Sequence, residues 1–117
     1  MKAFCRADSE RAINHLRPLR REFLGHRLTE EAGICGLEIV EGLLILQNGS
    51  AAEKLARQIV SEFTAAGFNK RAIAALAYLT EAITLNRAST TLATEVREYI
   101  VSLRTSPERD FVRAASE

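Results

Sequence analysis

Apolar side chains recur at intervals of three and four residues along most of the chain, whereas an alternating pattern never lasts more than a few residues. This spacing places apolar residues on one face of an α-helix and is typical of helices rather than strands. We therefore expect an all-α fold of five main helices. The predicted helices cover residues 9–24, 29–47, 50–66, 69–87 and 90–104, with a short sixth helix over 107–114.

The ends of these helices are predicted from residues that favour a helix start or stop. Ser50 and Glu53 have the spacing of a capping box at the start of the third helix. Gly67 suits the left-handed backbone that commonly ends a helix. Pro18 lies inside the first helix, where it removes one backbone hydrogen bond and should kink or split the helix. Further start signals are Asp8 or Ser9, Thr29, Asn69, and Ser89 or Thr90, and further stop signals are Gly25 and Asn48-Gly49.

The apolar pattern repeats after 40 residues, so that Ala12, Ala52 and Leu92 coincide. A single helix pair cannot bury its own apolar face, but stacked pairs share a continuous core. The repeat predicts antiparallel helix pairs stacked in register, and a plain antiparallel bundle of equal helices is the alternative. The other coincident positions are Leu16, Ala56 and Val96; Leu19, Ile59 and Tyr99; Phe23, Phe63 and Leu103; Ala32 and Ala72; Cys35 and Ala75; Ile39 and Leu79; and Leu43 and Ile83.

Part of this pattern resembles a known repeat family. The residues concerned are Leu55-Ala56, Ile59-Val60, Phe63, Gly67, Ala72, Ala75-Leu76, Leu79 and Ala82, followed by Val96, Tyr99-Ile100, Leu103-Arg104, Pro107-Glu108 and Phe111. Over about residues 29–112 the chain resembles degenerate tetratricopeptide repeats, and its end resembles the C-terminal helical-repeat region of some bacterial multidomain regulators. The resemblance implies a short α-solenoid of antiparallel helix pairs, with a concave groove that binds peptides or proteins without catalysis. It transfers no individual binding residue to this chain.

Two rows of residues along helix faces, each apolar but interrupted by glutamate, are candidates for partner binding. We call each row a stripe. The second helix is apolar almost all round and is therefore expected at the centre of the domain. Its interrupted stripe is Ile34, Glu38, Glu41 and Ile45, and the stripe 40 residues later is Ala74, Tyr78, Glu81 and Leu85. If these helices line a groove, the stripes lie side by side and form an apolar surface with acidic edges, which suits a basic amphipathic segment. The alternative is that the apolar residues belong to the core and the glutamates are solvated.

Charge suggests a second surface, although the formal net charge is only +1. Residues 1–27 hold seven Lys/Arg and three Asp/Glu, a balance of +4, and the remainder is −3. Arg17, Arg20 and Arg21 share one face of the first helix by their spacing. This basic face is most simply a solvated face, but it could contact nucleic acid, as in a transcriptional regulator, or an acidic stripe on a second copy in a homodimer.

The sequence shows no convincing catalytic, metal or cofactor site. His15 and His26 are too far apart for a metal pair on one helix turn, and neither Cys5 nor Cys35 has a zinc-ligand spacing. Two cysteines do not make a disulfide framework, and no apolar run reaches the ~20 residues of a membrane span. We therefore expect a cytoplasmic protein that is not an enzyme and uses no cofactor.

Gly33, Gly36 and Gly42 fall inside the second helix, where glycine is unfavourable unless a neighbouring helix approaches closely. This again predicts a central position for that helix. We expect one domain over residues 1–117 that acts as a protein–protein interaction or scaffold module. An unpaired first helix before two helix pairs suggests the terminal part of a larger regulatory protein.

Overall fold

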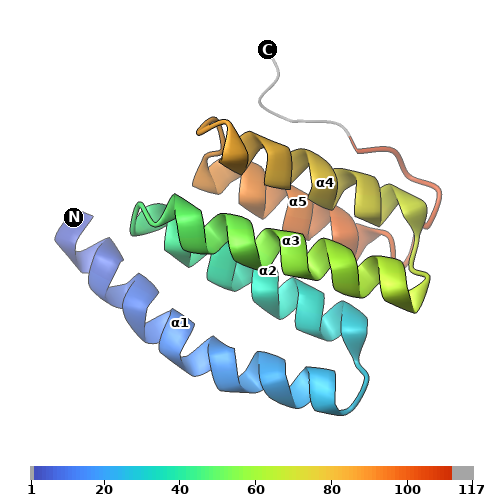
Figure 1. Cartoon of the computed structure of the whole chain (residues 1–117), viewed down its shortest axis with the longest axis horizontal. Coiled ribbons are helices and arrows are strands. Elements are labelled where there is room, and N and C mark those ends of the chain that lie inside the picture. Colours follow the sequence, from blue (N-terminus) through green and yellow to red (C-terminus); the bar gives the residue numbers. More distant parts are fainter. Residues whose placement is uncertain (1, 112–117) are drawn as a thin grey trace.

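The computed structural model describes the backbone of residues 2–111 and the side chains from Arg6 onward. It contains five helices and, within the described residues, no strand (Figure 1). The helices are α1 (Lys2–Gly25), α2 (Thr29–Ile45), α3 (Gly49–Ala66), α4 (Lys70–Thr84) and α5 (Thr90–Ser102). The predicted all-α fold with five main helices is confirmed.

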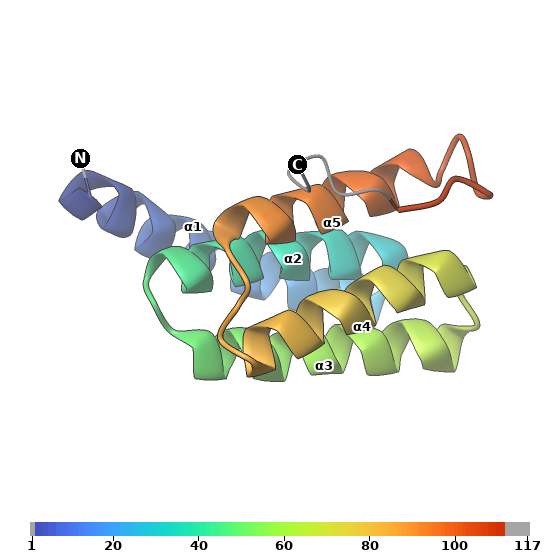
Figure 2. The same cartoon turned by 90° about the horizontal axis from the view of Figure 1, so that it is seen from above.

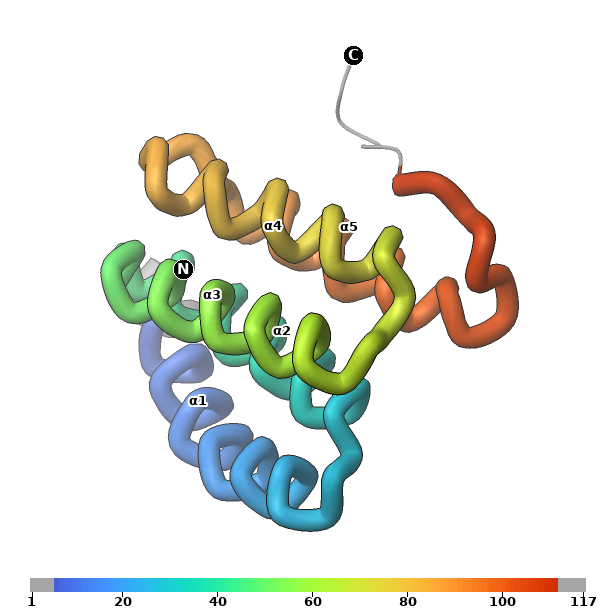
Figure 3. Tube along the Cα trace, turned by 45° about the vertical axis from the view of Figure 1, so that its right-hand side comes forward, coloured from blue at the N-terminus to red at the C-terminus, as the bar shows by residue number. Residues whose placement is uncertain are grey.

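The predicted sixth helix is absent over the described residues 107–111, and residues 112–114 lie outside the described part of the chain. The segment after α5 instead turns back toward α4 (Figure 3). Two of its backbone carbonyls accept hydrogen bonds from side chains: that of Pro107 from Asn69, which caps α4, and that of Arg109 from Tyr99 of α5. These tertiary bonds replace the local bonds that a helix would make.

The caps agree with the sequence at α4 and α5. The Asn69 side chain accepts from the N–H of Arg71, and the Ser89 hydroxyl accepts from the N–H of Leu92. Gly67 ends α3 with φ 69°, as its position predicts. These contacts satisfy backbone groups that the helix itself leaves unpaired.

Other predictions about helix ends are corrected. Neither Asp8 nor Ser9 starts the first helix, because both lie inside α1, which is already helical at Lys2. Asn48, not Ser50, caps α3, because its side chain accepts from the N–H of Ala51. Thr29 is already the first residue of α2, and Leu28 precedes it without a side-chain cap. Pro18 was expected to kink or split α1; the split does not occur, since the helix is continuous from Lys2 to Gly25.

The helices are arranged as a closed ring of four with a fifth outside. Successive contacts join α2 to α3, α3 to α4, α4 to α5 and α5 back to α2, while α1 packs on α2. Figure 2 shows α3 and α4 on one side of the molecule and α2 and α5 on the other. Within the described residues α2 contacts α1, α3 and α5 but not α4, so α2 is central, as predicted.

The 40-residue register holds for four helices and fails for the first. Ala52 and Leu92 are both buried, as are Phe63 and Leu103, and α2 and α4 match in the same way. Ala12, however, is exposed, so its environment is not equivalent to theirs. The buried positions of α1 include Ile13 and Arg20 instead, because α1 packs outside the ring and turns a different face inward.

The three internal glycines of α2 lie where neighbouring helices approach closely. A Cβ added to Gly33 would lie 2.5 Å from Cζ of Phe63, and one added to Gly36 would lie 2.8 Å from Cδ1 of Ile59. Gly42 faces Ile13 of α1. The predicted compensation for helical glycine is therefore confirmed, with α3 on one side of α2 and α1 on another.

None of the described helices combines the length and apolar character needed to cross a membrane.

Candidate partner-binding groove

Two residues of the predicted α2 stripe, Ile34 and Glu38, line a surface depression between α1 and α5, whereas Glu41 and Ile45 do not. Ile34 and Glu38 form part of its floor, and the depression has a volume of about 270 Å³. The complete lining is Leu16, Leu19 and Phe23 from α1; Glu31, Ile34, Cys35 and Glu38 from α2; and Val101 and Arg104, in and just after α5. We call this surface the groove. Most of its lining is apolar, as a protein-binding surface requires at its centre.

Ion pairs fix the α5 wall of the groove to α2. Glu41 accepts a hydrogen bond from the guanidinium Nε of Arg97 and another from Thr94 Oγ1 at 3.1 Å. The hydrogen bond to Glu41 raises the pKa of Arg97 above its usual value against the opposing effect of burial. The Glu41 side chain is therefore part of the α2–α5 interface, and its carboxylate is already occupied.

Arg104, just after α5, forms further ion pairs with the start of α2. Arg104 Nε donates to Glu30 Oε2 at 2.7 Å, and Arg104 Nη2 lies 3.6 Å from Glu31 Oε2. The bond to Glu30 raises the pKa of Arg104. Charged pairs thus border the apolar lining on the α5 side.

A mostly buried arginine, Arg20, attaches the α1 wall to its neighbouring helices. Arg20 forms two hydrogen bonds with Glu62 of α3, at 3.0 and 2.8 Å, and also donates to the backbone carbonyl of Ala32 on α2. The thiol of Cys35 lies 3.4 Å from the carbonyl oxygen of Leu16, which it can donate to. Both walls of the groove are therefore attached to the same central helix.

The groove carries an excess of negative charge. Its lining contains two carboxylates, those of Glu31 and Glu38, and one guanidinium, that of Arg104, while Glu30, Glu41 and Arg97 lie outside the lining. Three of the carboxylates pair with these arginines. Within the described residues, Glu38 makes no hydrogen bond or ion pair, although it is only partly exposed and lines the depression.

The stripe of α4 lies elsewhere, so the expectation that the two stripes lie side by side is not met. Tyr78 lies near the segment after α5, where its ring centroid is 6.3 Å from that of Phe111. Glu81 and Leu85 line a separate cavity of about 530 Å³ between α3 and α4. Because α5 occupies the place beside α2, the stripe on α4 cannot extend the groove.

The predicted basic face of Arg17, Arg20 and Arg21 is only partly present on the surface. Arg17 and Arg21 are exposed, but Arg20 is only 6% exposed and is paired with Glu62. Its carbon stem and guanidinium belong to the packing of α1 against α2 and α3. Two exposed arginines remain of the three that the helical spacing grouped together.

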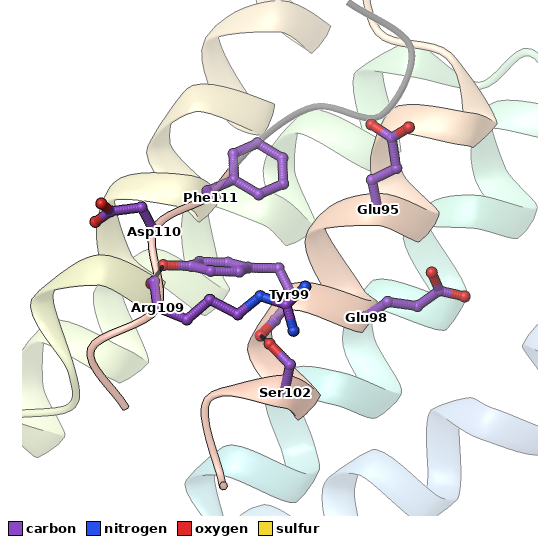
Figure 4. Close-up of a pocket in the computed structure, with 7 residues that line it drawn as sticks. All are labelled: Glu95, Glu98, Tyr99, Ser102, Arg109, Asp110 and Phe111. Atoms are coloured by element: carbon purple, nitrogen blue, oxygen red, sulfur yellow. Dashed lines mark hydrogen bonds between the residues drawn. The ribbon is translucent and has the colours of Figure 1, made fainter. Parts of the chain in front are cut away.

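A further cavity, of about 420 Å³, lies beside the segment after α5. Figure 4 shows Phe111 above the ring of Tyr99, with Glu95 and Glu98 on α5 across the opening. The ring centroids of Phe111 and Tyr99 are 5.1 Å apart. Arg71 of α4 and Asp110 form an exposed ion pair that holds the same segment.

Sequence reasoning identified the floor of the groove but not its walls. The 40-residue repeat predicts that Leu16, Leu19 and Phe23 lie in the core, yet each is partly exposed. Val101 is 40% exposed and was not singled out. The sequence pattern could have indicated this exposure. Val101 is an apolar residue that does not share the helix face of the buried Val96, Ile100 and Leu103.

The sequence matches no protein-family model, and neither a curated protein nor a solved structure matches it significantly.

Proposed function

We propose that this chain is a non-catalytic protein-interaction module that binds its partner in the groove. The observation that carries this proposal is the set of partly exposed apolar side chains, from Leu16 to Val101, that three helices bring together around α2. Exposed apolar surface bordered by charged residues is typical of a surface that another protein covers.

The attachment of both walls supports the same proposal. The pairs of Arg97 with Glu41 and of Arg20 with Glu62 hold α5 and α1 in place before a partner arrives. A preformed site loses less conformational entropy on binding than a mobile one.

The nucleic-acid interpretation has weaker support. Its basic face depended on Arg17, Arg20 and Arg21 together, and the burial of Arg20 leaves two exposed arginines. Phosphate binding by neutralisation increases with the number of cations that reach the backbone. A cytoplasmic location remains part of the proposal, because the free buried thiol of Cys35 suits a reducing compartment.

Site-specific photo-crosslinking tests the proposal. A benzoylphenylalanine at position 101 should give a discrete adduct with another protein in cells, and the same residue at position 85 should not. Leu85 is the matched control, since it is an exposed apolar residue, 53% accessible, and lies outside the groove. Adducts from position 85 without any from position 101 would move the interaction surface away from the groove.

A further inference from the structure

We infer that the groove binds a basic amphipathic α-helix, of which about two turns lie in contact with α2. This inference rests on the proposed function and adds the chemistry of the partner. It depends on four features of the groove: its walls, its length, its charge and its mismatch with a second copy of this chain.

The walls favour a helix as the bound element. The described residues contain no strand, so the groove offers no sheet edge to which an extended peptide could add. The floor and both walls are helices, whose backbone groups are already paired. A bound helix likewise satisfies its own backbone and can place apolar residues at intervals of three and four on the floor.

The length of the floor sets the length of the ligand. The α2 residues that line the groove run from Glu31 to Glu38. At a rise of ~1.5 Å per residue these two positions are roughly 10 Å apart along the helix axis. A helix lying along α2 would cover this distance with about two turns.

The charge of the groove specifies the flanking residues of the ligand. Glu38 lies between Leu16, Leu19 and Phe23 on one side and Val101 on the other, and makes no ion pair within the described residues. Covering Glu38 with an uncharged apolar helix would remove water from its carboxylate without replacing it. A lysine or arginine beside the apolar stripe of the ligand would instead provide a charge-assisted hydrogen bond.

A second copy of this chain does not provide such a helix. Between Asn14 and Glu22 the exposed residues of α1 are polar except Pro18, so this part of the basic helix has no outward apolar stripe; they are Asn14, His15, Arg17, Arg21 and Glu22. The outward face of α4 carries Tyr78 and Leu85 but places Glu81 between them, and that carboxylate would face Glu38. The partner is therefore a different polypeptide.

Selection from a phage-displayed library of randomised helical peptides tests the inference with the full chain as bait. Clones are kept if they bind the wild-type protein and are removed if they bind Val101→Asp. We expect the retained sequences to carry an apolar stripe flanked by Lys or Arg. Their synthetic peptides should bind Val101→Asp at least about tenfold more weakly, and Leu85→Asp with unchanged affinity, while both variants keep the helical circular-dichroism spectrum of the wild type.

Charge exchange then tests the role of Glu38. A selected peptide should lose about fivefold or more in affinity for Glu38→Lys, and a version with its flanking Lys changed to Glu should prefer Glu38→Lys to the wild type. Retained peptides that are neutral or acidic overturn the inference but leave the groove as a binding site. If no clone distinguishes the wild type from Val101→Asp, both the inference and the proposed function are wrong.

Discussion

Arg20 on α1 and Glu62 on α3 are 42 positions apart in the sequence, yet they form a bidentate ion pair. The side chain of Arg20 is 7% exposed and that of Glu62 is 17% exposed. Arg20 also donates to the carbonyl of Ala32, so one guanidinium connects three helices. Because α1 otherwise packs on α2, this contact is what joins the α1 wall to the four-helix ring at α3.

Replacing Arg20 with alanine should destabilise the fold by about 3 kcal/mol, since it leaves the carboxylate of Glu62 partly buried and unpaired. The measurement is urea unfolding followed by circular dichroism. Arg17→Ala is the matched control, because Arg17 is an exposed arginine on the same helix and should change stability by less than about 0.5 kcal/mol. Equal effects of the two substitutions would show that the buried pair has no special role.

Gly33→Ala should destabilise the protein even though alanine favours helices. The added methyl would meet the ring of Phe63, which is fully buried and cannot move aside freely. We expect the strain of overpacking, about 1–3 kcal/mol, to exceed the gain of roughly 1 kcal/mol in helix propensity. Gly49→Ala, where no atom lies within 4 Å of the added Cβ, should be neutral or stabilising in the same thermal unfolding measurement.

Tyr99→Phe should loosen the segment after α5 while the helices remain folded. The substitution removes the hydroxyl that donates to the carbonyl of Arg109 but keeps the ring that contacts Phe111. A loss of about 1 kcal/mol in local stability should increase cleavage by trypsin after Arg109 several-fold. Thr91→Ala, an exposed change on α5, is the control and should leave cleavage unchanged.

Cys35 should be a slowly reacting thiol. Burial raises its pKa above the ordinary value, the charge of Glu38 raises it further, and Arg20 partly opposes both. Since the thiolate is the reactive form, Cys35 in a Cys5→Ser background should react with Ellman's reagent at pH 8 more slowly than glutathione does. A rate equal to that of glutathione would contradict the burial of this thiol.

The same shift predicts a loss of stability at alkaline pH. The folded thiol has the higher pKa, so the unfolded chain releases its proton first, from about pH 8.5 upward. The free energy of unfolding should therefore fall between pH 8 and pH 10. The fall should be smaller in Cys5→Ser with Cys35→Ala than in Cys5→Ser alone, as measured by urea titration at each pH.

The sequence predicted those features that depend on neighbouring residues. The three- and four-residue apolar spacing located all five helices, and Asn69, Ser89 and Gly67 act as the predicted caps or stop. The capping of α3 was assigned to Ser50 rather than Asn48, because two good capping residues stand two positions apart and local preference does not choose between them.

The site was partly predictable for the same reason. Ile34 and Glu38 share a face of α2 by helical spacing, and the structure places them together in the groove. The walls depended on which helices stand beside α2. The 40-residue repeat suggested α4, but α5 closes the ring against α2, and Val101 rather than Tyr78 or Leu85 completes the groove.

The sequence by itself determined the helices, the central position of α2 and the apolar and acidic character of its outer stripe, because these follow from backbone geometry and from the spacing of side chains along one helix. Only the tertiary structure decided that Ala12 is exposed, that Arg20 is buried against Glu62, and that α5 rather than α4 borders α2. These outcomes depend on how side chains distant in the chain fit together in three dimensions, and helical periodicity carries no information about that fit.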